Sequence, residues 1–152
     1  MYRFMLCSLF LCLPGITLAG DDFKIDGKFT GNGKAAKLNS LVVKKGDNDR
    51  KGRLILMFSE KTPKASDTDV AAMFGRLGDA LVITMKEDGK ITGCLVAHTA
   101  HGDGGFQSIG EIECKDFKIA DGKISGKLTT NGEQKAFGKN WEVDLKFTGK
   151  MP

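Results

Sequence analysis

The sequence predicts an all-β domain, mainly an antiparallel meander of about eight or nine short strands, with one short helix. Apolar and polar residues alternate with a period of two, most clearly over 23–29 and 141–147, which is the pattern of half-buried strands. Asp-Gly or Asn-Gly pairs at 88–89, 121–122 and 131–132 separate strand-like segments, and such pairs favour tight hairpin turns.

The short spacing of these turns along the chain helps to choose between a barrel and a sandwich. Hairpins follow one another along the second half of the chain, so we expect a small β-barrel in preference to a β-sandwich.

The N-terminal stretch has the pattern of a secretory signal peptide. Arg3 precedes an apolar run over 4–13, and small residues at 17–19 suit a signal peptidase. The run is too short for a membrane-spanning helix, which needs about 20 apolar residues. We therefore expect residues 1–19 to be removed, residues 20–152 to form one β-rich domain, and the protein to be periplasmic or secreted.

Charge argues against a nucleic-acid partner. Of the 23 basic residues only Arg3 lies in the signal segment, so 22 basic residues remain against 19 acidic ones. The lysines are interleaved with acids, whereas nucleic-acid binding favours a clustered basic patch. No later apolar run is long enough to span a membrane.

Cys94 and Cys114 are the cysteines that remain after removal of the signal segment. An exported chain with an even number of cysteines is typical of a disulfide-bonded protein. The sequence therefore predicts a disulfide between these two residues, which would stabilise the fold by about 3 kcal/mol in the entropic description. A free pair, or a pair of metal ligands, is the alternative.

The first half of the domain begins with strands over 23–29 and 35–45. Residues 53–59, with the sequence RLILMFS, are apolar on both faces. This pattern predicts a central strand covered on both sides.

A helix follows at about 67–77. Asp67 is the expected N-cap, and Gly78 follows the helix where a left-handed residue is favoured. Apolar residues at 70, 73, 74 and 77 have helical spacing and predict one buried stripe. Met73 and Phe74 could instead face a ligand.

Asp88-Gly89 predicts the next hairpin. A two-residue turn there places Cys94 opposite Ile83 and His98 near Asp79. Cys94 and His98 then share one face of the second strand.

In the second half of the domain the sequence predicts strands over 108–119 and 123–130, joined by the Asp-Gly pair at 121–122. The parity of apolar residues changes near 115–116, which indicates a β-bulge. A short edge strand over 133–137 and a strand over 141–147 complete the sheet structure.

His98, His101 and Asp103 form the cluster with metal-ligand chemistry. Two imidazoles and a carboxylate are ligands that zinc or copper accepts. The chain has only two histidines and no third strong ligand nearby, whereas a structural zinc site usually has four ligands. The alternative is a pair of ordinary loop histidines at the end of a strand.

The glycine-rich loop that follows is a candidate for partner binding, because long loops on rigid scaffolds often carry recognition. Phe106 is its candidate exposed anchor, although its ring could instead pack back onto the sheet. The loop residues are Gly102, Asp103, Gly104, Gly105 and Phe106.

Enzymatic activity is not favoured. The serines lack a nucleophile-elbow context, and the glycine-rich loop does not open a helix as a nucleotide-binding loop does. No acidic residue lies in an apolar neighbourhood that would tune it for catalysis.

The segment GKLTTNGEQKAFGKNWEVDLKF, residues 126–147, resembles the closing hairpins of the lipocalin-like periplasmic proteins that bind isoprenoids. The resemblance covers hairpin pattern alone and transfers no ligand.

The sequence thus predicts an exported, disulfide-stabilised, non-enzymatic binding protein. Its target is either a small apolar ligand inside a barrel or an extracytoplasmic protein bound through residues 99–107. The alternatives are an inhibitor of a secreted enzyme and a metal-binding protein that uses His98 and His101.

Overall fold

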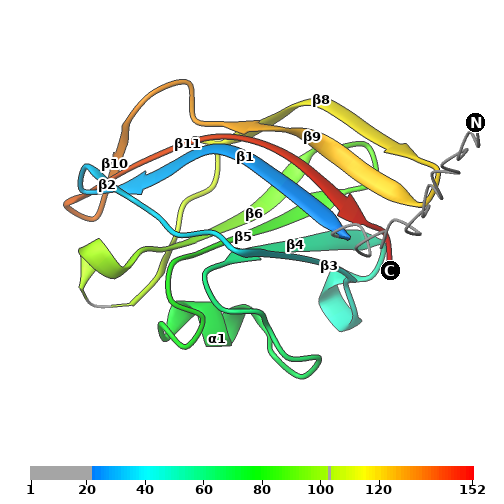
Figure 1. The fold of residues 1–152 in the computed structure, drawn as a ribbon, viewed down its shortest axis with the longest axis horizontal. Helices are drawn as coiled ribbons and strands as arrows, with labels where there is room; N and C mark the ends of the chain where they lie inside the picture. The colour runs from blue at the N-terminus through cyan, green and yellow to red at the C-terminus, as the bar shows by residue number, and fades with distance from the viewer. Residues whose placement is uncertain (1–21, 103) are drawn as a thin grey trace, which may run out of the picture.

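The computed structural model describes residues 22–102 and 104–152, which form two antiparallel β-sheets packed face to face (Figure 1). Sheet A has the order β2 (Lys34–Ala35), β1 (Phe23–Gly31), β11 (Lys139–Lys150), β9 (Lys123–Thr129) and β8 (Glu113–Ala120), with β10 (Gln134–Ala136) also paired with β11. Sheet B has the order β3 (Ser40–Lys45), β4 (Arg53–Ser59), β5 (Ala80–Lys86), β6 (Ile91–Ala97) and β7 (Phe106–Gln107). The all-β class predicted from the sequence is confirmed.

The preference for a barrel is wrong. The two sheets stay separate and pack as a sandwich. The chain passes between sheets where Ala36 N donates to Phe29 O of sheet A and Asn39 N donates to Ser59 O of sheet B. Within the described residues no hydrogen-bonded ladder joins the sheets. The hairpins predict local pairing only, and local pairing is the same in a barrel and in a sandwich.

The main core fills the space between the sheets. The strand β11 points alternate side chains inward, as the sequence predicts, and β4 and β5 supply their aliphatic side chains from the opposite side. Their burial removes apolar surface from water, which is the main favourable term in folding. The fully buried members include Phe29, Leu56, Phe58, Leu81, Ile83, Ile124, Leu128, Trp141 and Val143.

The strand β4 is covered on both sides, as its sequence predicts. Leu56 faces sheet A, whereas Met57 faces a second cluster formed with the helix α1 (Asp69–Met73). Figure 1 shows α1 beneath sheet B, on the side away from sheet A. No helix within residues 22–102 and 104–152 is long and apolar enough to cross a membrane.

The helix α1 differs from its prediction in length, cap and buried face. Thr68 is the N-cap residue, and Asp67 instead accepts a hydrogen bond from Lys64 N at 2.8 Å. The buried face consists of Ala71 and Ala72, whereas Phe74 points into solvent. The helix ends at Met73, before Gly75 with its φ of 69°. Small alanines let the helix lie close to sheet B, which the apolar spacing alone did not indicate.

The predicted hairpin registers are confirmed at the positions that place the candidate site. Ile83 pairs with Cys94 in the β5–β6 hairpin. The register of β8 against β9 shifts between Lys115 and Lys118, around Asp116 with its φ of 52°, as expected for the predicted bulge.

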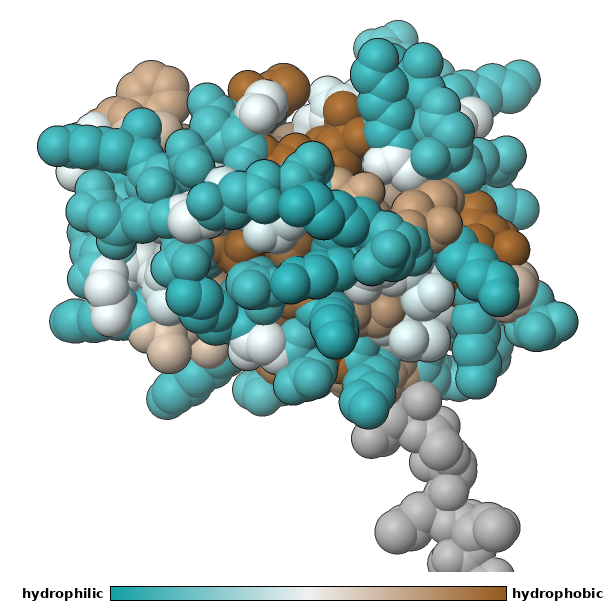
Figure 2. Space-filling model, turned by 90° about the horizontal axis from the view of Figure 1, so that it is seen from above, coloured by the Kyte–Doolittle hydropathy of each residue, from teal (hydrophilic) through white to brown (hydrophobic). Residues whose placement is uncertain are grey.

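The outer face of sheet A is hydrophilic, as Figure 2 shows from above. Ion pairs cross neighbouring strands, with Lys28 Nζ 2.8 Å from Glu142 Oε1 and Lys127 Nζ 2.8 Å from Asp144 Oδ1. The interleaved charges of the sequence are therefore the solvated face of a sheet.

We expect Ala72→Leu to lower the free energy of unfolding by about 1–3 kcal/mol, because the added methyl groups overpack a buried position. Val70→Leu in the same helix is the matched control, since Val70 is half exposed and surface changes usually stay within about 0.5 kcal/mol. Urea unfolding of the two variants measures the difference. Equal stabilities would show that α1 does not pack against sheet B through its alanines.

Candidate functional site

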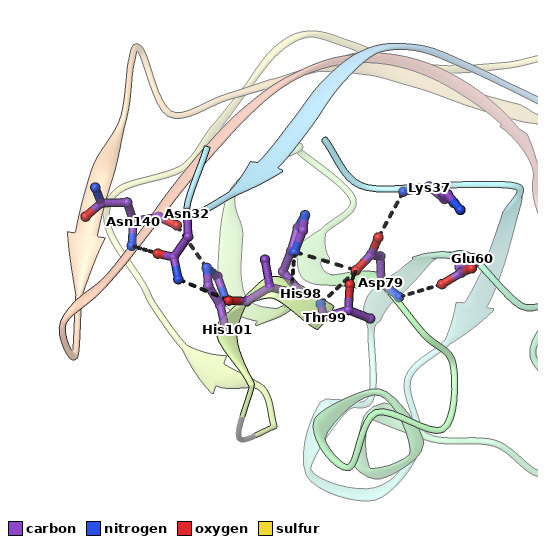
Figure 3. A network of polar contacts seen from close by, with 9 residues as sticks. Asn32, Lys37, Glu60, Asp79, His98, Thr99, His101 and Asn140 are labelled. Carbon is purple, nitrogen blue, oxygen red and sulfur yellow. Dashed lines mark hydrogen bonds and ion pairs between the residues drawn. The ribbon is translucent and has the colours of Figure 1, made fainter. Parts of the chain in front are cut away.

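The candidate site lies at one end of the sandwich, around a short 3₁₀ helix, η2 (Thr99–His101), that directly follows β6. His98 begins this helix as its N-cap. Figure 3 shows the η2 residues with Asp79 on one side and with Asn32 and Asn140 together on the other. Segments far apart in the sequence therefore meet at η2.

His98 is buried between the two sheets, with its side chain only 2% exposed. Its ring meets the ring of Phe29 edge-on, with centroids 5.3 Å apart. It also lies against Gly31, where an added Cβ would come within 2.4 Å of His98 Cγ. The absence of a side chain at Gly31 therefore makes the space that His98 occupies.

The hydrogen bonds of His98 fix its tautomer. Ala100 N donates to His98 Nδ1 at 3.0 Å, so Nδ1 carries no proton in this arrangement. The proton of the neutral ring is then on Nε2, which is buried without a well-formed hydrogen bond, although the backbone of Lys34 lies close enough to the ring to favour its charged form. Burial lowers the pKa of His98 against the opposing attraction of Asp79, and this favours the neutral ring.

Asp79 anchors the N-terminal side of η2, and the predicted proximity of Asp79 to His98 is confirmed. Its Oδ1 accepts hydrogen bonds from Thr99 N and Thr99 Oγ1, both at 2.8 Å, and its Oδ2 accepts one from Lys37 N at 3.0 Å. Burial alone would raise the pKa of the Asp79 carboxyl, but these hydrogen bonds outweigh it and hold the pKa below its usual value. Asp79 is therefore a charged, fully engaged structural carboxylate.

Asn32 and Asn140 hold the other side of η2. Asn32 Nδ2 donates to Ala100 O at 3.1 Å, and Asn32 Oδ1 accepts from Asn140 N at 3.0 Å. His101 Nε2 lies 2.9 Å from Asn140 O and donates to it, because a carbonyl only accepts. The Nδ1 of His101 is buried without a hydrogen-bond partner.

The two histidine rings are neighbours, with centroids 5.5 Å apart, but they differ as metal ligands. A metal-binding histidine normally donates its other N–H to an acceptor, and His101 does so toward Asn140. His98 does not, because its Nδ1 accepts from Ala100 and a metal on Nε2 would require an anionic ring. Among the residues described, no group of three or more His, Cys, Asp or Glu side chains could hold a metal ion. Asp103 lies outside the described residues.

The glycine-rich loop is closely packed at its far end. Gly105 N donates to Met73 O at 2.8 Å, which ties the loop to the end of α1. Phe106 is only 8% exposed and contacts the rings of His101 and Trp141, with centroids 5.5 and 6.3 Å away. Of the two alternatives for Phe106, the structure shows the one in which its ring packs back onto the sheet.

Two other phenylalanines are exposed around this loop. The sequence raised Phe74 as a residue that could face a ligand, but it did not indicate Phe137. Phe137, at the tip of the β10–β11 hairpin, is 80% exposed and its ring contacts Phe106 at a centroid distance of 5.9 Å. Phe74, beside Met73, is 72% exposed. We call Phe74, Phe137, Gly102 and residues 104–106 the aromatic end. The unusual Phe-Gly pair at a hairpin position was the available signal.

The predicted disulfide is not formed in the structure, where Cys94 and Cys114 are both free thiols. Cys94 is in β6 of sheet B and Cys114 in β8 of sheet A. The expected export and an even number of cysteines predicted a disulfide, but only geometry decides whether two sulfurs meet. Burial raises the pKa of Cys94 to about 12 and that of Cys114 to about 11.

Comparison with protein-family models, with curated proteins and with solved structures found no match to this chain. The site is therefore interpreted from its own geometry.

We expect Gly31→Ala to destabilise the fold by about 1–3 kcal/mol, because the new methyl group would overlap the buried ring of His98. Gly93→Ala is the matched control, since its Cβ would meet Thr84 Cβ at a milder 3.2 Å. Chemical unfolding, together with the His98 ring resonances in NMR spectra, measures both effects. An unperturbed His98 in Gly31→Ala would contradict the described packing.

The two thiols should react slowly in the folded protein. At pH 8 their raised pKa values leave thiolate fractions on the order of 10³-fold (Cys94) and 10²-fold (Cys114) below that of an ordinary cysteine. Colorimetric thiol assays with and without denaturant, and without reductant, should find two thiols that react rapidly only after unfolding. If the unfolded chain showed no reactive thiols, Cys94 and Cys114 would be joined in a disulfide.

Proposed function

We propose that the protein is an exported, non-enzymatic binding protein that recognises a protein partner through its aromatic end. The observation that carries the proposal is the conformation and exposure of Phe137. Its ring lies largely in solvent, and its backbone has a φ of 52°. A bulky residue in this region is unusual and costs about 1–2 kcal/mol.

The turn explains why this conformation is required. Phe137 and Gly138 join Ala136 to its pairing partner Lys139, and both central residues have positive φ. This is a type I′ arrangement, for which Asn-Gly is the favoured pair. Phenylalanine therefore fits the turn poorly and gains little burial within the chain, whereas contact with a partner would bury its ring.

The surroundings of Phe137 also suit recognition. The network from Asn32 to Asn140 holds η2 and β11 together, so the surface is organised before binding and loses little entropy on association. Aromatic residues are enriched among the residues that dominate binding energy. Lys135 is exposed on the same hairpin, and Lys34 is exposed at the same end of sheet A (Figure 1). A partner with an apolar pocket and an acidic rim would complement this surface.

Binding of a small apolar ligand inside the fold has less support. A hollow of about 170 Å³ lies beside Ile25, Phe29 and Leu145, whereas small-molecule sites usually occupy roughly 300–1,000 Å³. Inhibition of a secreted enzyme is a narrower form of partner binding, and Phe137 rather than Phe106 would be its anchor.

We expect Phe137→Asn to raise the free energy of unfolding by up to about 1 kcal/mol, because asparagine accepts positive φ more readily. The same change should weaken partner binding at least tenfold, as the loss of an aromatic anchor does. Stability and binding thus move in opposite directions, which a purely structural role for Phe137 would not produce.

Binding can be measured by photo-crosslinking in the native cells, with a photoreactive residue at Lys135. The matched control places that residue at Lys146, which is exposed on the outer face of β11. We expect a crosslinked protein from position 135 alone, with a yield that falls at least tenfold with Phe137→Asn. Equal yields from both positions, or no dependence on Phe137, would contradict the proposal.

A further inference from the structure

We infer that η2 is a pH-dependent latch, which closes only while His98 is neutral and opens when its ring takes up a proton. The latch rests on the hydrogen bonds of His98. Its consequence for the partner, release from the aromatic end at acidic pH, rests on the proposed function.

The cap of η2 requires an unprotonated nitrogen. Ala100 N–H donates to His98 Nδ1, and a protonated Nδ1 would present a second donor to that N–H. The cap hydrogen bond and the charged ring therefore exclude each other. A histidine used as an N-cap in this way differs from the usual Ser, Asp or Asn caps, because its acceptor disappears in mildly acidic solution.

Three ionisable groups face His98, and together they define the open state. Asp79 Oδ1 is 3.6 Å from Nδ1 and attracts a proton to the ring, whereas the neighbouring His101 opposes the positive charge. The backbone of Lys34 favours the charged form and its ammonium group opposes it. A protonated Nδ1 would donate to Asp79 Oδ1, which already accepts hydrogen bonds from Thr99 N and Thr99 Oγ1.

The rearrangement would spread along η2. Without its cap, the part-buried N–H of Ala100 loses its hydrogen-bond partner in the protein. Movement of Ala100 also removes its carbonyl from Asn32 and strains the bond of His101 to Asn140. His101 contacts Phe106, and Phe106 contacts Phe137, so the opening reaches the aromatic end through direct contacts.

The direction of the pH dependence follows from the lowered pKa of His98. The unfolded chain has the ordinary histidine pKa of about 6.5, whereas burial lowers the pKa of the folded chain. The neutral ring therefore stabilises the closed latch fully above about pH 6.5, and this stabilisation is lost as the pH falls through the pKa of the folded state.

Hydrogen exchange measured by NMR between about pH 7 and pH 4 tests the latch without any partner. After correction for the intrinsic exchange rate, we expect the protection factor of the Ala100 amide to fall at least tenfold. The midpoint of this fall should equal the midpoint of the His98 ring titration. The amide of Ile83 in β5 is the internal control and should keep its protection. An unchanged Ala100, a different midpoint, or global unfolding before His98 titrates would each overturn the inference.

His98→Asn is the matched variant, because an asparagine side chain can accept from Ala100 N–H and does not titrate in this range. We expect the protection of Ala100 to be independent of pH in this variant. If it does not fold, the shared midpoint of ring and amide in the unmodified protein still decides the question.

The crosslinking yield at position 135, measured across the same pH range, tests the link to the partner. A yield that falls at least tenfold with the His98 titration supports release at acidic pH. A working latch with no crosslinked partner at any pH contradicts the proposed function alone. A partner whose crosslinking is independent of pH contradicts the release alone.

Discussion

The arrangement of the end of the sandwich around η2 depends on one buried, neutral imidazole. His98 ends the face of β6 that points into the core, and its ring fills the space left open by Gly31 on the opposite sheet. The same ring caps η2 through Ala100. One side chain thus joins the two sheets by packing and organises the following loop by hydrogen bonding. A larger residue at Gly31 would disturb both the packing and the cap together.

The two halves of the molecule are stabilised by different kinds of interaction. The space between the sheets is filled by aliphatic and aromatic side chains that carry no charge, and such a core responds little to pH. The end around η2 depends on directional bonds among Asp79, Asn32 and Asn140. Two buried histidine nitrogens at that end, His98 Nε2 and His101 Nδ1, have no well-formed hydrogen bond. The hydrogen-bonding groups of this end are therefore less completely paired.

Much of the fold followed from local sequence pattern. Alternation predicted the inward side chains of β11, and the predicted β5–β6 pairing of Ile83 with Cys94 brings His98 beside Asp79, although the register shifts between Thr84 and Met85 nearer the turn. The closure of the sheets did not follow, because hairpins define neighbours within a sheet and not the relation between sheets. The predicted apolar stripe of the helix was wrong at Val70 and Phe74, which are exposed, whereas Met73 and Leu77 pack in the second cluster. The pattern missed Ala71 and Ala72 because alanine carries little weight in an apolar pattern, although its small size is what allows close packing.

The same limitation explains why the sequence singled out Phe106, which is buried, and not Phe137, which is exposed. Phe106 lies in the glycine-rich loop that attracts attention, yet its ring is held by His101 and Trp141. Phe137 lies in a short hairpin turn, where an aromatic residue looks like part of a strand until its positive φ is known. The inner ring supports the outer one, since Phe106 contacts both η2 and Phe137. Because the exposed ring rests on a surface that η2 shapes, a change in the charge of His98 can alter recognition while the apolar core stays folded.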